Sequence, residues 1–167
     1  MKNETFWVFL LVNMLLLTSC YSYHAQVNKS SKKLFKQLNK PTAFVVNQTE
    51  FPNEFKVLKK SELYTLTNDS NSLLKIKLYK QIPVRRFNCF TGQATVLLFT
   101  LGQLPVKTEN NQYFKLEEIT KDSSKLLEFE LKVYTRTWFW DILSWRKNFN
   151  NQLALSLRNE KVLLNKP

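Results

Sequence analysis

Two glutamates, Glu128 and Glu130, have a spacing that suits paired acid catalysis. They lie in residues 127–133, where apolar residues alternate with charged ones, so both carboxylates project from one face of a predicted strand. Glycosidases use two carboxylates that flank a sugar bond. The solvated face of any strand shows the same alternation, however, and we favour that interpretation. The neighbouring Glu117 and Glu118 are expected to point to opposite faces of their strand.

The sequence lacks the residues that nucleophilic catalysis, zinc binding or phosphate binding would need. His24 is the only histidine, and we place it in a polar segment before the folded domain. Cys89 lies between Phe87 and Phe90 and is expected to be a buried small hydrophobe, so a Cys-His nucleophile is not predicted. Zinc sites need several Cys or His ligands, and no glycine-rich phosphate loop occurs. We therefore predict no catalytic residue, no metal and no cofactor.

The N-terminal residues have the pattern of an export signal. Residues 6–17 are apolar except for Asn13, which is too short for a permanent span of roughly 20 residues but suits a signal peptide. An ordinary secretory cut after Ser22, with Cys20 and Ser22 as the small pair, is one alternative. If Cys20 were not lipidated, a disulfide between Cys20 and Cys89 would become the natural alternative in an oxidising compartment.

The segment Leu17-Thr18-Ser19-Cys20 resembles the lipobox of bacterial lipoproteins, directly after the hydrophobic region. The resemblance implies that Cys20 becomes the N-terminus and carries a diacylglyceryl group, often with further acylation such as palmitate. It also implies a bacterial envelope location, on the periplasmic side or at the cell surface. The expected organisation is a signal peptide over 1–19, a lipidated cysteine and tether over 20–33, and a globular domain over 34–167.

A net charge of +12 indicates attraction to anionic partners. Anionic lipid headgroups or an acidic envelope polymer are the expected ones, although a Lys- and Asn-rich composition is also typical of a genome with low GC content. No nucleic-acid partner is expected, because nothing resembles an aromatic RNA-binding signature or a zinc finger.

Alternating and apolar runs predict a β-rich domain. We expect short strands at 43–47, 55–59 and 63–67, a hairpin over 62–80, and a strand buried on both faces at 94–101. A second hairpin is expected to join 112–119 to 127–133 through a turn at 121–124. Helical spacing begins at about Asn150. The fold class is therefore mainly β within α+β, an antiparallel single domain with a C-terminal helix.

Two segments, FPNEFKVLKKSELYTL and FTLGQLPV, give a second resemblance. They are similar to a group of small, largely uncharacterised bacterial lipoproteins with a Thr-Leu-Gly-x-x-Pro turn after a strand and a C-terminal helix. The resemblance implies no catalytic residues. In the turn, Gly102 permits a positive φ and Pro105 ends the strand.

The segment WFWDILSWRKNF, residues 138–149, combines tryptophans with basic residues. Such a combination suits the headgroup region of a bilayer, and the residues that would contact the membrane are Trp138, Trp140, Trp145, Arg146 and Lys147. Packing of these rings over the sheet is the commoner outcome for an aromatic stripe, and it stays open beside the membrane interpretation.

These observations predict a non-enzymatic, membrane-anchored envelope lipoprotein that binds a surface or a protein partner. A hydrolase acting on envelope polymer, with Glu128 and Glu130 as its acids, is the first alternative. An accessory subunit of an envelope complex is the second.

Overall fold

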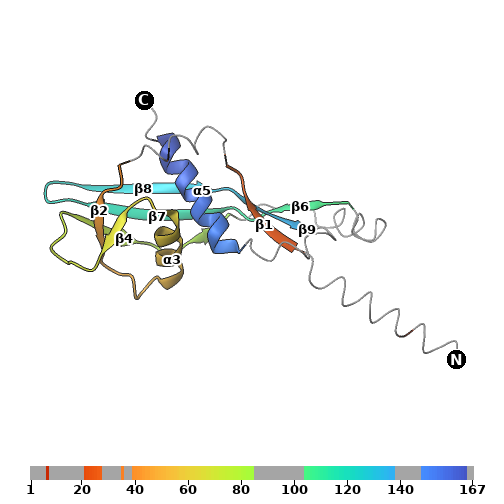
Figure 1. Ribbon diagram of the computed structural model, residues 1–167, viewed down its shortest axis with the longest axis horizontal. Coiled ribbons are helices and arrows are strands. Elements are labelled where there is room, and N and C mark those ends of the chain that lie inside the picture. The colour runs from red at the N-terminus through yellow and green to blue at the C-terminus, as the bar shows by residue number, and fades with distance from the viewer. Residues whose placement is uncertain are drawn as a thin grey trace.

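A long bent hairpin runs through the molecule and contributes strands to both of its sheets (Figure 1). Its first arm is β6 and β7 and its second is β8 and β9, with bounds Val106–Glu109, Gln112–Ile119, Ser124–Leu131 and Val133–Thr137. The computed structural model describes residues 7, 21–27, 35, 39–84, 104–137 and 148–164. Only Lys132 separates β8 from β9, so the second arm passes directly from one sheet to the other.

The strands form a three-stranded and a six-stranded sheet. The first has the order β1-β9-β6, with β1 spanning Tyr21–Ala25, and all its pairings are antiparallel. The second has the order β3-β2-β4-β7-β5, with β8 paired to β7. Its other strands are β2 (Thr42–Val45), β3 (Thr65–Thr67), β4 (Leu74–Leu78) and β5 (Ile82–Pro83).

Two helices cover one face of the larger sheet. They are α3 (Pro52–Ser61) and α5 (Phe149–Leu164), which pack on each other, while α5 also reaches β8, β9 and β1. The core lies between helices and sheet, and its fully buried side chains include Ile76, Leu78, Phe114, Leu116, Leu131, Leu153 and Leu157. Alternate residues of β4, β7 and β8 enter this core, which is why their sequences alternate.

Side-chain hydrogen bonds satisfy the backbone at the bend of the hairpin. The Val133 N–H donates to Asn111 Oδ1 at 3.2 Å, and the Lys132 N–H donates to Ser156 Oγ at 2.8 Å. Nearby, the Ala25 N–H donates to Gln152 Oε1 at 2.9 Å. Asn111 and Ser156 are buried, so their polar atoms replace water where the regular ladder is interrupted. These bonds fix α5 against β1 and the bend.

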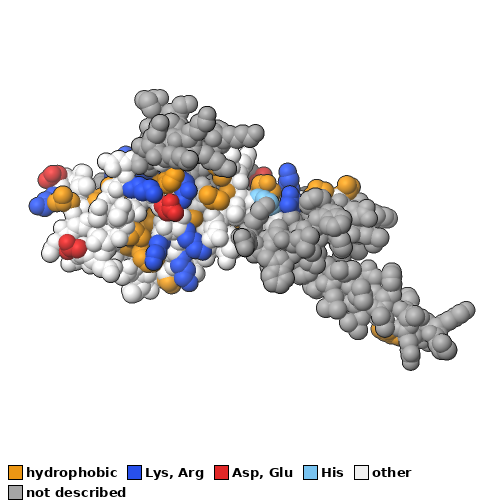
Figure 2. All heavy atoms as spheres, viewed as in Figure 1, with side chains coloured by type: hydrophobic (Ala, Val, Ile, Leu, Met, Phe, Trp, Pro, Cys, Tyr) orange, Lys and Arg blue, Asp and Glu red, His pale blue; other side chains and the backbone are white. Residues whose placement is uncertain are grey.

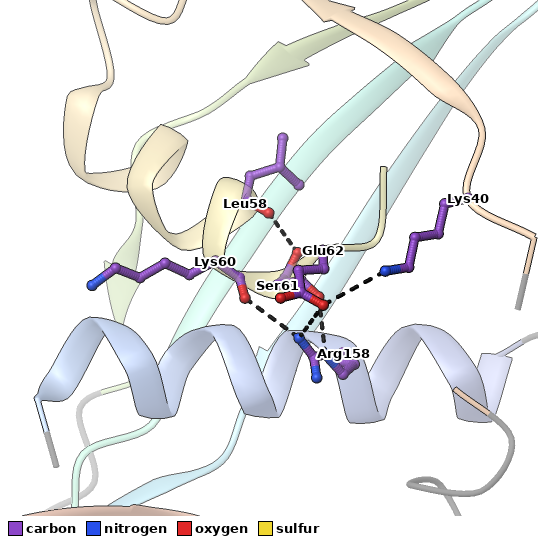
Figure 3. Close-up of polar contacts among 6 residues, drawn as sticks. All are labelled: Lys40, Leu58, Lys60, Ser61, Glu62 and Arg158. Carbon is purple, nitrogen blue, oxygen red and sulfur yellow. Dashed lines mark hydrogen bonds and ion pairs between the residues drawn. The ribbon is translucent and has the colours of Figure 1, made fainter. Parts of the chain in front are cut away.

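A second set of contacts joins α3 to α5 (Figure 3). Arg158 of α5 donates from Nε to the Ser61 carbonyl at 2.9 Å, which satisfies an end carbonyl of α3. Its guanidinium also lies 3.4 Å from Glu62 Oε2, and Lys40 Nζ lies 3.6 Å from the same oxygen. Glu62 ends the helix in the left-handed region, at φ 54°. Arg158 therefore acts as a structural cap.

Several sequence predictions are confirmed. The fold is β-rich α+β with a C-terminal helix, and α5 begins one residue before the predicted position. The predicted hairpin appears as β7 and β8, whose register pairs Gln112 with Leu131 and Ile119 with Ser124. Strand β4 buries Ile76 and Leu78 and exposes Lys75 and Lys77, as its alternation indicated.

Two predictions in residues 52–80 are wrong. The predicted strand at 55–59 is part of α3, where Pro52 at the first turn and Lys59 and Lys60 in the last turn are helix signals. The predicted hairpin over 62–80 does not form, because β3 and β4 both pair with β2, in parallel, on its two sides. The helix α3 supplies the crossover that parallel pairing of β2 with β3 requires.

The predicted tether over 20–33 is wrong for residues 21–25. These residues form β1, and the register pairs Tyr21 with Thr137 and Ala25 with Val133. The residues 28–33 lie outside the described part of the chain, as do the predicted strand at 94–101, Cys20 and Cys89. Within the described residues, no helix has the length and apolarity needed to cross a bilayer.

Amide hydrogen exchange tests the placement of β1. We expect the Ala25 and Gln26 amides to exchange within about tenfold of those of β9, because both are hydrogen-bonded, whereas an unstructured tether would exchange at the free-chain rate. In Gln152→Ala, exchange should accelerate at Ala25, which loses its acceptor. Gln26, whose N–H donates to the Lys132 carbonyl, is the internal control. Free-chain exchange throughout 21–26 would contradict the placement.

Candidate functional site

One face of the three-stranded sheet carries polar side chains from all three strands, and we call it the polar face. Its first row pairs Ser22 of β1 with Arg136 of β9 and Lys107 of β6, and its second pairs His24 with Tyr134 and Glu109. A third row lies at the bend. The complete set is Ser22, His24, Gln26, Lys107, Glu109, Asn111, Lys132, Tyr134 and Arg136.

The alternation of each strand explains this arrangement. Residues two apart share a face, so Tyr23 and Ala25 of β1 and Val133 and Thr135 of β9 point the other way. On that side the rings of Tyr23 and Phe149 lie 4.9 Å apart, and both pack against the core. Because the start of α5 covers this apolar side, the polar residues of the sheet are left on the opposite face.

The tyrosine ring at the centre of the polar face is in contact with both neighbouring strands. The His24 ring stacks on Tyr134 with centroids 5.3 Å apart, and Lys107 Nζ lies 5.4 Å from the Tyr134 centroid. Ser22 Oγ and His24 Nε2 share a hydrogen bond of 2.8 Å. Ser22 is buried, so this pair does not present an accessible nucleophile.

A pocket of about 470 Å³ opens on the inner part of the polar face. Lys107, Glu109, Tyr134 and Lys132 contribute to its lining, together with the amides of Gln26 and Asn111. Among the described residues, Lys107, Lys132 and Arg136 of the face stand against Glu109 and against Glu130 of β8, which lies 3.5 Å from Asn111 Nδ2. The face therefore has an excess of positive charge and suits an anionic ligand.

The predicted acid pair lies elsewhere, on the uncovered side of the larger sheet. Glu128 is exposed and accepts from Lys115 Nζ at 2.6 Å, whereas Glu130 is half-buried with Asn111 Nδ2 at 3.5 Å. The two glutamates share a strand face, as predicted. Neither Glu128 nor Glu130 lines the pockets beside Lys107, Asn71 and Tyr64.

Glu117 and Glu118 point to opposite faces, as predicted. Glu117 accepts from Tyr79 at 2.8 Å on the uncovered side. Glu118 lies on the helical side and accepts from Tyr64 Oη and, at 2.7 Å, from Lys161 Nζ. Glu118, Tyr64 and Lys161 line part of a pocket of about 300 Å³ between α5 and the start of β4.

Hydrogen bonding determines the titration of this second cluster. Burial by itself raises the pKa of Glu118, but hydrogen bonds from Lys161 and Tyr64 and the charge of Lys161 outweigh burial and lower that pKa below 4.5. Burial, together with the bond to Glu118, raises the pKa of Tyr64 above its usual 10.0. The Tyr64 hydroxyl and the Lys161 ammonium both donate to Glu118, which indicates a structural role.

Sequence patterns do not predict most of the polar face. They assign His24 to a tether and predict no strand at the position of β6, so they give Lys107 and Glu109 no place in the fold. The alternation of Ser22, His24 and Gln26 is a signal that could have indicated a strand. The predicted lipidation site Cys20 and the predicted membrane contacts Trp138, Trp140, Trp145, Arg146 and Lys147 lie outside the described residues.

Comparison with known proteins adds no family assignment. The sequence matches no protein-family model and none of the curated proteins. Within the described residues, no group of three His, Cys, Asp or Glu side chains is placed to hold a metal ion.

The pH dependence of stability tests the assignment of Glu118. A lowered folded-state pKa means that the carboxylate stabilises the fold above the unfolded pKa of about 4.5, and that this contribution is lost as pH falls through the lower folded value. The difference in free energy of unfolding between wild type and Glu118→Gln should therefore be largest near pH 7 and shrink towards pH 3.

Urea unfolding across that pH range measures the difference. The matched control is Glu128→Gln, an exposed ion-pair partner on the other side of the sheet, which should change stability by less than about 1 kcal/mol at pH 7. A wild-type advantage over Glu118→Gln that grows on acidification would show the sign to be wrong.

Proposed function

We propose that this protein is a lipid-anchored protein of the bacterial envelope with a non-enzymatic, surface- or partner-binding role. The observation that supports it is the register of the three-stranded sheet. Tyr21, which follows Cys20 in the chain, is paired with Thr137, which precedes Trp138. Val106 is paired with Thr137 from the other side.

The register pairs the two residues that adjoin the predicted lipidation site and the predicted membrane-contact segment in the sequence. Paired residues in antiparallel strands have Cα atoms about 5 Å apart. The chain positions that adjoin Cys20 and the Trp-rich segment are therefore neighbours, although more than a hundred residues separate them in the sequence. A lipid on Cys20 and interfacial contacts by Trp138, Trp140, Trp145, Arg146 and Lys147 would act at the same end of the domain.

This arrangement also fixes how the domain would meet the membrane. Because β1 starts at Tyr21, an acylated Cys20 holds the domain directly and leaves no flexible spacer between lipid and sheet. The turn that joins β7 to β8 lies at the opposite end of the long hairpin (Figure 1). In this proposal the larger sheet and its helices project away from the bilayer and are available to a partner.

The non-enzymatic part of the proposal has separate support. Glu128 is in an exposed ion pair with Lys115, Ser22 is shielded from substrate, and Glu118 is held by Tyr64 and Lys161. Each of these groups is already engaged within the fold, and the exposed Glu128 lines none of the pockets beside Lys107, Asn71 and Tyr64.

The anchor is tested by Cys20→Ala in a bacterial host that processes lipoproteins. We expect the wild-type mature protein to begin at Cys20 and to carry the added mass of a diacylglyceryl group, with or without a third acyl chain. We expect Cys20→Ala to lack that mass and to stay as an unprocessed precursor. Intact mass spectrometry and labelling with radioactive palmitate are the measurements.

Cys89→Ala is the matched control, because it removes the other thiol and should leave lipidation unchanged. A wild-type protein with a free thiol at position 20, or with an N-terminus at Tyr23, would contradict the proposal.

A further inference from the structure

We propose that Arg136 and Lys107 bind the phosphate of an anionic phospholipid beside the anchor. The inference rests on the proposed function and deepens it by naming the lipid class and the residues. It starts from the row of the polar face that pairs Ser22, Arg136 and Lys107, which is the row nearest the Cys20 end of the sheet.

The depth of this row matches the headgroup layer. A strand rises about 3.3 Å per residue, so the row lies about 3 Å inward from Tyr21, the first residue of β1, which follows Cys20 in the chain. The polar layer on each side of a bilayer is about 5–8 Å thick, from the difference between total and hydrocarbon thickness. With a lipid on Cys20 in the hydrocarbon, the backbone of Arg136 and Lys107 would lie at the level of the phosphates.

The third row gives the contrast. Lys132 belongs to the same face but lies opposite Gln26, about 17 Å from Tyr21 by the same rise. At that height it is beyond the headgroups. All three basic residues share a face, but they differ in distance from the anchored end of the sheet. Arg136 and Lys107 are near enough to reach lipid phosphates, and Lys132 is not.

The chemistry of the first row suits a phosphate. The planar guanidinium of Arg136 can donate two parallel hydrogen bonds to phosphate oxygens, and the ammonium of Lys107 adds a second positive charge one strand away. Lys107 is exposed and Arg136 is half-buried. In the structure the Lys107 ammonium lies over the Tyr134 ring of the next row, 5.4 Å from its centroid, and it would turn toward the Arg136 row to reach a phosphate.

The test uses the mature, lipidated protein in nanodiscs of phosphatidylcholine, with and without phosphatidylglycerol. We expect phosphatidylglycerol to raise the melting temperature of wild type by roughly 3 °C, because a ligand of the folded state stabilises it. We expect Arg136→Gln/Lys107→Gln to lose the shift. Lys107→Gln alone, at an exposed position that tolerates substitution, should lose about half of it, and Lys107→Arg should retain it.

The matched control is Lys56→Gln/Lys59→Gln, which removes the same charge from the exposed side of α3. Figure 2 shows Lys and Arg side chains over this helical layer. The control therefore tests whether basic side chains elsewhere on the surface contribute to the shift in melting temperature. It should keep the full shift. Inorganic phosphate added to phosphatidylcholine nanodiscs should give no shift, which separates a lipid headgroup from free phosphate.

Each other result overturns the inference. A shift that survives in Arg136→Gln/Lys107→Gln, that disappears equally in the α3 control, or that free phosphate reproduces would each contradict it, as would no response of wild type to phosphatidylglycerol. The mass of the mature N-terminus is measured on the same samples. A protein that lacks the lipid contradicts the proposed function, whereas a lipidated protein without the shift contradicts only the phosphate site.

Discussion

The pairing of β9 with β1 on one side and β6 on the other is the constraint on which the account depends. It places Tyr21, Val106 and Thr137 at one end of the three-stranded sheet. Side-chain hydrogen bonds hold this register: they come from buried Asn111 at the bend, and from half-buried Gln152 and buried Ser156 of α5. A slip of one residue would exchange the two faces of β1 and move Tyr23 away from the core.

Periodicity predicted the parts of the fold whose partners are close in sequence. Strands β7 and β8 are joined by a short turn, and alternate residues such as Phe114 and Phe129 are buried, so the local pattern was sufficient. Helix α3 was missed because residues 55–59 were considered without Pro52, which marks the helix start. The parallel pairing of β2 with β3 and β4 has no local signal, since it depends on the crossover that α3 provides.

The polar face could not be assembled from the sequence for the same physical reason. His24, Lys107 and Tyr134 come from three separate segments, and each one alone has the appearance of an ordinary solvated residue. Their grouping depends on β1 joining the sheet through partners about 110 residues away. Glu128 and Glu130 lie on a solvated strand face, which is the interpretation that the sequence analysis favoured over paired acid catalysis.

Relaxation enhancement of backbone amides by a gadolinium-labelled headgroup lipid measures the orientation of the lipidated protein in nanodiscs. The account predicts strong broadening at Tyr21, Val106 and Thr137, at the end where the sheet meets the bilayer, and little at Lys121 in the turn between β7 and β8. Equal broadening at both ends, or stronger broadening at Lys121, would contradict it.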